Sequence, residues 1–162
     1  MHPVILIRHP KERLSKCSLR GLEERAHLTF CRATPTFRLD VRGHLLLQLG
    51  APVLEASMRV DPVTGEVRPL VLLDSTWRLV PHLEASLRNV AQAIRVGLPE
   101  GLQTAYPRSS KLTEDPSGRL SSIEALYVAL RLLGQDDPSL LDTYHWRDAF
   151  LEGLRRHPSF AQ

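Results

Sequence analysis

Short apolar runs along the chain predict buried strands. Residues 4–8 form an apolar run bounded by prolines, which is typical of a buried strand. Residues 69–74 are apolar on both faces, as expected of a central parallel strand covered by helices. Residues 36–42 alternate between polar and apolar positions, the pattern of a half-buried strand. Further strand candidates are residues 45–49, 53–60 and 102–105.

Apolar positions at helical spacing predict the helices. Residues 11–28 are predicted as a helix or a helix followed by a loop, and residues 80–94 as a helix that stops near Gly97. The tetrad Ser-Ser-Ile-Glu at 121–124 matches a capping box, and Gly134 suits the end of the helix that follows. Pro138 is placed to open a last helix. The order of strands and helices indicates an α/β layered fold.

Composition places the chain among globular proteins. Its 162 residues correspond to about one domain, with 43% apolar and 24% charged residues. The apolar runs are too short to cross a bilayer, and no basic leader precedes the first one. We therefore expect a cytoplasmic monomer with no membrane partner. Two cysteines are too few for a disulfide framework or for a zinc site of their own, so no metal is expected.

The charge is uneven along the chain. Residues 1–42 hold nine Lys and Arg against four acids, whereas the whole chain has a net charge of only +3. The basic stretch predicts a surface for a polyanion, although a solvated surface would have the same composition. Turn residues at 61–65 suggest that the chain divides into two lobes at this point. We expect a small, mainly β, N-terminal α+β lobe at 1–63, which carries this basic surface, and a second domain at 64–162.

Asp74 is the strongest candidate for chemistry. It ends the predicted central strand, and ligands of open α/β sheets bind beyond the carboxyl ends of the strands. A partly desolvated carboxylate there is suited to accept a proton. The alternative is that Asp74 caps the next helix. The chain has no G-x-G-x-x-G, P-loop or H-E-x-x-H motif, which argues against the usual dinucleotide enzymes, P-loop NTPases and zincins.

Several motifs in order resemble one family. Residues 72–77 (Leu-Leu-Asp-Ser-Thr-Trp) look like a strand-end D-x-[ST]-W group, and residues 102–107 with 120–125 are similar to a small-residue-Pro loop and an L-S-T-x-E-A helix start. Residues 140–150 resemble a closing aromatic helix, and residues 9–11 with 16–19 are weakly similar to a D-P-K-K-C-[ST] start. The chain thus resembles the DTW-domain proteins and the ribosomal RNA aminocarboxypropyltransferases. Ser75 interrupts the D-T-W triplet, and residues 106–111 differ from the ribosomal branch.

The resemblance implies a SPOUT-like fold, in which a parallel sheet has helices on both faces and the chain forms a C-terminal trefoil knot. It implies S-adenosylmethionine as donor of a 3-amino-3-carboxypropyl group to N3 of uridine or pseudouridine, in rRNA or tRNA. Such a displacement needs no metal. One alternative is a SPOUT-type RNA methyltransferase, which has the same fold with the donor turned. The other is a non-catalytic RNA-binding or ribosome-assembly protein.

The resemblance also implies site residues. Asp74 would be catalytic, near the sulfonium and the acceptor base. Trp77 would offer its backbone to the methionine part of the donor, and the turns at 98–102 and 105–107 would enclose adenine and ribose. The expected donor-binding residues are Ser18, Leu49, Leu73, Trp77, Leu98, Leu102, Ala105, Tyr106, Pro107 and Ser122. From the distribution of charge, the expected RNA-binding residues are Arg8, Lys11, Arg13, Lys16, Arg20, Arg108 and Lys111.

Overall fold

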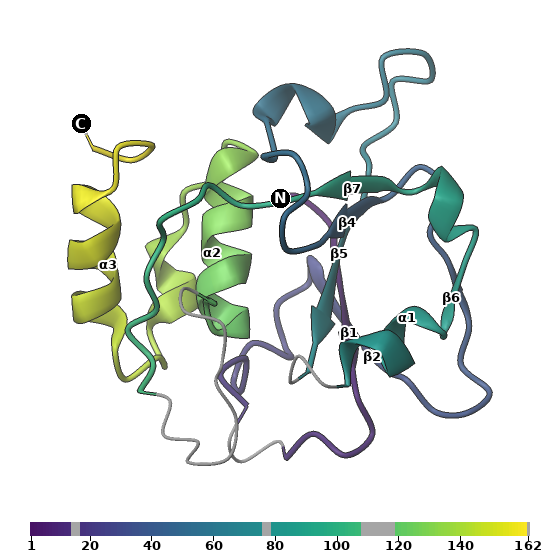
Figure 1. Cartoon of the computed structure of the whole chain (residues 1–162), viewed down its shortest axis with the longest axis horizontal. Coiled ribbons are helices and arrows are strands. Elements are labelled where there is room, and N and C mark those ends of the chain that lie inside the picture. The colour runs from purple at the N-terminus through teal and green to yellow at the C-terminus, as the bar shows by residue number, and fades with distance from the viewer. Residues whose placement is uncertain (14–16, 76–78, 108–118, 162) are drawn as a thin grey trace.

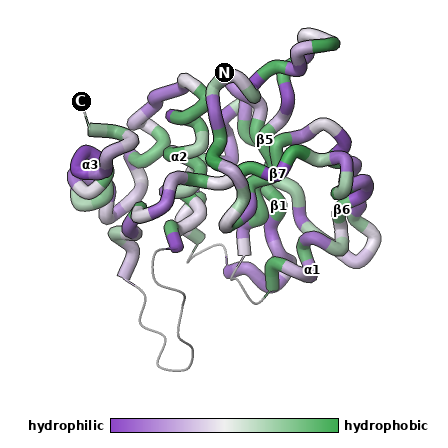
Figure 2. The backbone as a smooth tube through the Cα atoms, turned by 45° about the horizontal axis from the view of Figure 1, so that its top comes forward, coloured by the Kyte–Doolittle hydropathy of each residue, from purple (hydrophilic) through white to green (hydrophobic). Residues whose placement is uncertain are grey.

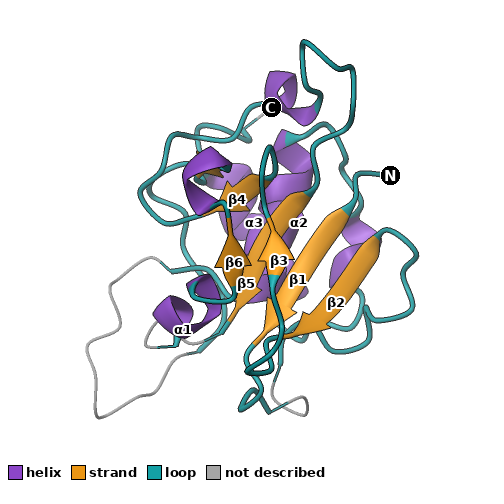
Figure 3. Cartoon of the chain, turned by 90° about the vertical axis from the view of Figure 1, so that its right-hand side faces the viewer, coloured by secondary structure: helices purple, strands orange, loops and turns teal. Residues whose placement is uncertain are grey.

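A twisted sheet of five parallel strands forms the centre of the computed structural model, which describes residues 1–13, 17–75, 79–107 and 119–161 (Figures 1 and 3). The strand order is β2-β1-β5-β4-β7. The strands are β1 (Val4–Arg8), β2 (Leu28–Arg32), β4 (Leu45–Leu47), β5 (Leu70–Asp74) and β7 (Ile94–Val96). A second, two-stranded parallel sheet pairs β3 (Leu39–Asp40) with β6 (Leu87–Arg88).

The described residues form three α-helices and several short 3-10 helices around the central sheet. The α-helices are α1 (Val80–Glu84), α2 (Ser122–Leu132) and α3 (Arg147–Arg156). The 3-10 helices described are η2 (Ala56–Arg59), η3 (Val90–Gln92) and η4 (Pro138–Leu141). In Figure 1, α2 and α3 lie side by side on one side of the sheet, while α1 and β6 lie on the other. The expected α/β fold with a parallel sheet is confirmed.

The alternation of side chains along the two central strands produces two cores. Val4 and Leu6 of β1, with Leu70 and Leu72 of β5, pack in a large cluster with the apolar residues of α2 and α3. The residues between them point the other way, and Ile7 and Val71 pack with Leu46, Leu83 of α1 and Leu87 of β6. Figure 2 shows hydrophobic residues gathered along β1, β5 and β7. The last residue of each central strand therefore faces α2.

The strands expected at residues 4–8 and 69–74 are confirmed as β1 and β5, and β5 is the middle strand of the sheet. The strand expected at 45–49 forms as the shorter β4, and only Leu39–Asp40 of the expected 36–42 strand is a strand. The capped helix near 121–133 is confirmed as α2, which Gly134 follows with a φ of +84°. The last helix is also confirmed, although Pro138 opens η4 and α3 begins later, at Arg147.

Other expectations were wrong. The predicted helix at 80–94 ends at Glu84, and its remaining apolar residues lie in β6, η3 and β7. Described residues 17–27 form turns, and the chain then continues into β2, which the sequence pattern did not indicate. Residues 53–60 contain η2 between two isolated bridges, and residues 102–105 have no strand. Short apolar segments fit several periods equally well, so their final state depends on tertiary neighbours.

The central sheet crosses the division expected between residues 63 and 64. Strands from before that point (β2, β1, β4) and after it (β5, β7) alternate in the sheet, so the structure does not show a separate N-terminal lobe. The trefoil knot stays a prediction. Within the described residues, no helix is both long enough and apolar enough to cross a membrane.

Candidate active site at the carboxyl ends of the strands

The register of β1 and β5 places Arg8 beside Asp74. The two residues are Cα partners, and each is the last residue of its strand. Both side chains lie on the face covered by α2, and both residues are buried, with Asp74 only 3% exposed. Arg8 Nε donates a hydrogen bond of 3.3 Å to Asp74 Oδ2. A buried ion pair therefore lies at the carboxyl ends of the strands, where α/β proteins bind ligands.

Three further residues complete what we call the Asp74 cluster, which consists of Arg8, Cys17, Glu23, Asp74 and Ser122. Ser122 Oγ donates to Asp74 Oδ1 over 2.7 Å, and Cys17 Sγ donates to Oδ2 over 3.2 Å. Arg8 Nη2 donates to Glu23 Oε1 at 3.1 Å and to Cys17 Sγ at 3.6 Å. Arg8, Cys17 and Ser122 thus donate to Asp74 from three separate segments and fix the direction of its carboxylate.

Asp74 does not cap the helix that follows it. Leu79 is the N-cap residue of α1, and no side chain caps that helix. The alternative interpretation of Asp74 as a helix cap is therefore wrong. Its described partners come instead from β1, from the turn at Cys17 and from the start of α2.

Cys17 is a part of the site that the sequence analysis did not single out. Burial, together with the charge of Asp74, raises the pKa of the Cys17 thiol to about 11. The thiol is therefore protonated at neutral pH and acts as a hydrogen-bond donor rather than a nucleophile. The only sequence signal was its position in the Lys-Cys-Ser-Leu segment that is weakly similar to the family's start motif.

The start of α2 is held by a fully buried carboxylate. Glu124 accepts hydrogen bonds from the Ser121 N–H (2.8 Å), as a capping box requires, and from the Ala105 N–H (2.8 Å). It also accepts from the hydroxyls of Thr104 (2.7 Å) and Tyr144 (2.9 Å). Glu124 thus fixes the turn at 104–106 against the N-terminus of α2. The sequence analysis identified Glu124 only as part of the capping box.

The same helix start brings together several expected donor-binding residues. Ser18 Oγ accepts a 3.2 Å hydrogen bond from the Ile123 N–H, so the turn at Ser18 contacts the first turn of α2. The Tyr106 ring packs on Trp146, with ring centroids 4.9 Å apart. Ser18, Ser122, Ala105 and Tyr106 therefore lie around one helix N-terminus, whose dipole favours an anionic group.

The other expected donor-binding residues are more dispersed. Leu49 is 69% exposed in the loop after β4, and half-buried Leu98 follows β7. Leu102 is buried in the core, and half-buried Leu73 packs on the opposite face of the sheet from Asp74. Pro107 is exposed, and Trp77 lies outside the described residues.

Gly97 sets how closely the loop after β4 approaches β7. A Cβ at this position would lie 2.4 Å from the Ala51 carbonyl oxygen, and the Gly97 N–H donates to Pro52 O over 2.7 Å. We expect Gly97→Ala to destabilise the fold by about 1–3 kcal/mol and to displace the loop that carries Leu49. Urea unfolding measures the first effect, with Gly153→Ala as the control, because that position has open space. Equal stability of both variants would contradict the assigned packing.

The expected RNA-binding residues divide into two kinds. Lys11, Arg13 and Arg20 are exposed, whereas Arg8 is buried and paired with Asp74 and Glu23. Lys16, Arg108 and Lys111 lie outside the described residues. Among the residues that the structure describes, no group of His, Cys, Asp or Glu side chains is arranged to hold a metal ion.

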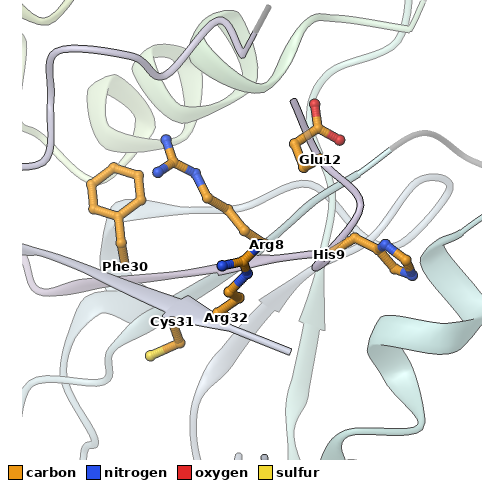
Figure 4. A pocket seen from close by; sticks show the side chains of 6 residues that line it. All are labelled: Arg8, His9, Glu12, Phe30, Cys31 and Arg32. Carbon is orange, nitrogen blue, oxygen red and sulfur yellow. The ribbon is translucent and has the colours of Figure 1, made fainter. Parts of the chain in front are cut away.

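A hollow of about 160 Å³ lies beside the Asp74 cluster, at the carboxyl ends of β1 and β2 (Figure 4). Its lining residues are Arg8, His9, Glu12, Phe30, Cys31 and Arg32. Burial, and then the charge of Asp74, raises the pKa of Glu12. The hollow and the cluster share Arg8, so they are neighbouring parts of one edge of the sheet.

No family model matches the chain, and a search of curated proteins finds no match. Among solved structures, the chain is similar to the SAM-dependent rRNA:acp-transferase Tsr3 from Vulcanisaeta distributa. The TM-score is 0.65 and the sequence identity 26%, and the match covers 94% of this chain and 78% of that one. The resemblance to the ribosomal RNA aminocarboxypropyltransferases that the sequence motifs indicate is therefore confirmed by the structure.

Proposed function

We propose that this protein transfers a 3-amino-3-carboxypropyl group from S-adenosylmethionine to N3 of a uridine or pseudouridine in ribosomal RNA. The observation that carries the proposal is the similarity of 94% of the chain to an enzyme that is a SAM-dependent rRNA:acp-transferase. The buried Asp74 cluster supports it, because it supplies a carboxylate at the edge of the sheet where a ligand is expected.

The residues at the start of α2 fit the donor. Its amino acid carboxylate is proposed to lie near the N-terminus of this helix of 11 residues, at Ser18 and Ser122, where the helix dipole favours an anion. Main-chain groups at Ala105 and Tyr106, together with Leu98 and Leu49, are proposed to contact the nucleoside. When bound, the donor supplies the transferred group attached to a sulfonium sulfur. The rest of the donor leaves as a neutral thioether when the carbon–sulfur bond breaks.

Asp74 is the proposed catalytic residue. N3 of uridine carries a proton, which must leave as the new bond between N3 and carbon forms and the carbon–sulfur bond breaks. Asp74 is proposed to take this proton, while its described donors Arg8, Cys17 and Ser122 fix the direction of the carboxylate. Holding N3 in line with the reacting carbon supplies the rest of the rate, because displacement depends strongly on alignment.

Donor binding tests the proposal independently of RNA. We expect S-adenosylmethionine to bind with a micromolar Kd, which corresponds to about −8 kcal/mol. Calorimetric titration measures this affinity, and S-adenosylhomocysteine is the matched ligand that lacks the transferable charge on sulfur. The absence of heat, together with the absence of a thermal shift at millimolar donor, would contradict an enzymatic function and favour the RNA-binding alternative.

The exposed basic residues are proposed to bind the RNA backbone. Replacing Lys11, Arg13 and Arg20 together by Gln should weaken RNA binding, and the slope of log K against log salt should fall by about 0.7–0.9 for every phosphate that is no longer bound. Filter binding at several salt concentrations measures both effects. A triple variant of Arg88, Arg95 and Arg155, which are also exposed but lie outside the basic stretch at 1–42, is the control. Equal slopes for the two triple variants would mean that the N-terminal basic residues only contact solvent.

A further inference from the structure

The two oxygens of the Asp74 carboxylate have different surroundings. Oδ2 accepts hydrogen bonds from Arg8 Nε (3.3 Å) and from Cys17 Sγ (3.2 Å). Oδ1 accepts from Ser122 Oγ over 2.7 Å. A positive charge beside a carboxylate oxygen disfavours a proton there. Oδ1, which faces a neutral hydroxyl, is therefore the oxygen of Asp74 that is suited to take a proton.

Burial restricts how a proton can reach this carboxylate. Asp74 is only 3% exposed, and its described partners come from β1, from the segment before β2 and from the start of α2. An RNA base is too large to contact such a carboxylate without displacing one of these partners. A proton, in contrast, can pass through a partner that both accepts and donates.

Arg8 and Cys17 are not suited to pass a proton. The Arg8 guanidinium stays protonated and has no acceptor atom. Cys17 is buried, and its sulfur already accepts a hydrogen bond from Arg8 Nη2 over 3.6 Å. Both residues therefore hold Oδ2 in place and keep the proton from approaching on that side.

Ser122 has both of the required properties. A hydroxyl group has one donor and two acceptor lone pairs, so Ser122 Oγ can accept a proton while it donates its own to Oδ1. Ser122 is half-buried and is the first residue of α2, the helix start at which the donor carboxylate is proposed to lie. Among the described partners of Asp74, Ser122 is thus the one placed between the carboxylate and the substrates.

We propose that Ser122 is a catalytic residue that relays the N3 proton of the acceptor base to Asp74 Oδ1. The electron pair of the N3–H bond forms the bond to carbon, and the proton goes to Ser122 Oγ as the hydroxyl proton goes to Oδ1. The carbon–sulfur bond breaks, and its electron pair stays on sulfur, which becomes neutral. This inference rests on the proposed function, and it assigns the Ser122 hydroxyl to proton transfer and not to donor binding.

Rates of Ser122 variants provide the first test. Ser122→Ala should slow single-turnover transfer at saturating donor by about 10²-fold, the lower end of the range for proton-transfer catalysis. Ser122→Thr retains the hydroxyl and should stay within a few-fold of wild type. The calorimetric donor Kd should be unchanged in both variants. Weaker donor binding by Ser122→Ala, with a wild-type rate at saturating donor, would mean that the hydroxyl holds the donor and would overturn the relay.

Ser139→Ala is the matched control. Ser139 is also half-buried near the start of a helix, η4, and its Oγ donates to Asp137 Oδ1 over 2.5 Å. The variant therefore removes the same kind of hydrogen bond from a pair that does not include Asp74. It should transfer at the wild-type rate. Equal losses of rate in Ser122→Ala and Ser139→Ala, with equal losses in melting temperature, would reduce the Ser122 effect to stability and contradict the proposal.

Solvent deuterium separates a relay from a residue that only orients Asp74. A relay moves two protons in one step, whereas direct transfer to Asp74 moves one. In mixtures of H₂O and D₂O, the single-turnover rate should follow a curve against the deuterium fraction for wild type and Ser122→Thr, and a straight line for Ser122→Ala. The same dependence in wild type and Ser122→Ala would assign Ser122 to orientation alone and sink the relay.

Failure of the relay and failure of the proposed function give different results. If wild type transfers the aminocarboxypropyl group and Ser122→Ala transfers it equally fast, only the relay is wrong. If wild type binds the donor and RNA but transfers nothing, the proposed function is wrong, and the relay is wrong with it.

Discussion

Asp74→Asn should slow group transfer by about 10²-fold or more while leaving donor binding nearly intact. The amide retains the size of the carboxylate but cannot take the N3 proton. It also removes the charge that pairs with Arg8, although Glu23 remains as a partner of that guanidinium. Single-turnover rates, measured with saturating donor, report the transfer step separately from product release.

Two controls make this result specific. Asp142→Asn changes an exposed carboxylate and should have the wild-type rate. Calorimetry on Asp74→Asn should give a donor Kd within a few-fold of wild type. If the variant transferred at the wild-type rate, Asp74 would have no part in the chemistry. If it failed to bind the donor instead, its role would be to position the donor.

Glu124→Gln should produce the largest loss of stability in the molecule, about 3–5 kcal/mol in the free energy of unfolding. The buried carboxylate accepts four hydrogen bonds, and an amide in its place turns an N–H₂ group toward donors. Urea unfolding followed by circular dichroism measures the loss. We also expect weaker donor binding, because the turn at 104–106 is no longer fixed to α2.

Glu152→Gln is the matched control for this variant. Glu152 is exposed on α3 and pairs with Arg156, and such surface pairs contribute about 0–1 kcal/mol. A loss below about 1 kcal/mol in Glu124→Gln would mean that the four donors find other partners, and that Glu124 does not hold the site together.

The sequence was sufficient for features that depend on local patterns. The two central strands are apolar on both faces, and the capping box at Ser121 and Glu124 is a short-range signal, so both were predicted correctly. The position of Asp74 at the end of the middle strand could be predicted because it closes the most apolar run of the chain. These inferences need no knowledge of which segments meet in space.

The remaining features depend on contacts between distant segments. In the sequence, Arg8 is one of several basic residues that could lie on the surface. Only the register of β1 against β5 brings its side chain into contact with Asp74, 66 residues away. Cys17 reaches Asp74 from the segment before β2, and Ser122 from the start of α2. The hollow likewise requires β2, a strand with mixed burial that apolar periodicity did not reveal. No pattern along the chain encodes such pairings.

The position of two labels in the donor tests the proposed reaction most directly. The protein is incubated with ribosomal RNA and S-adenosylmethionine labelled either in the carboxyl carbon or in the methyl group, and the RNA is then digested to nucleosides. We predict that the carboxyl label enters a uridine-derived nucleoside and that the methyl label does not. Entry of the methyl label alone would identify a methyltransferase, and entry of neither label, with both substrates bound, would contradict a transfer reaction.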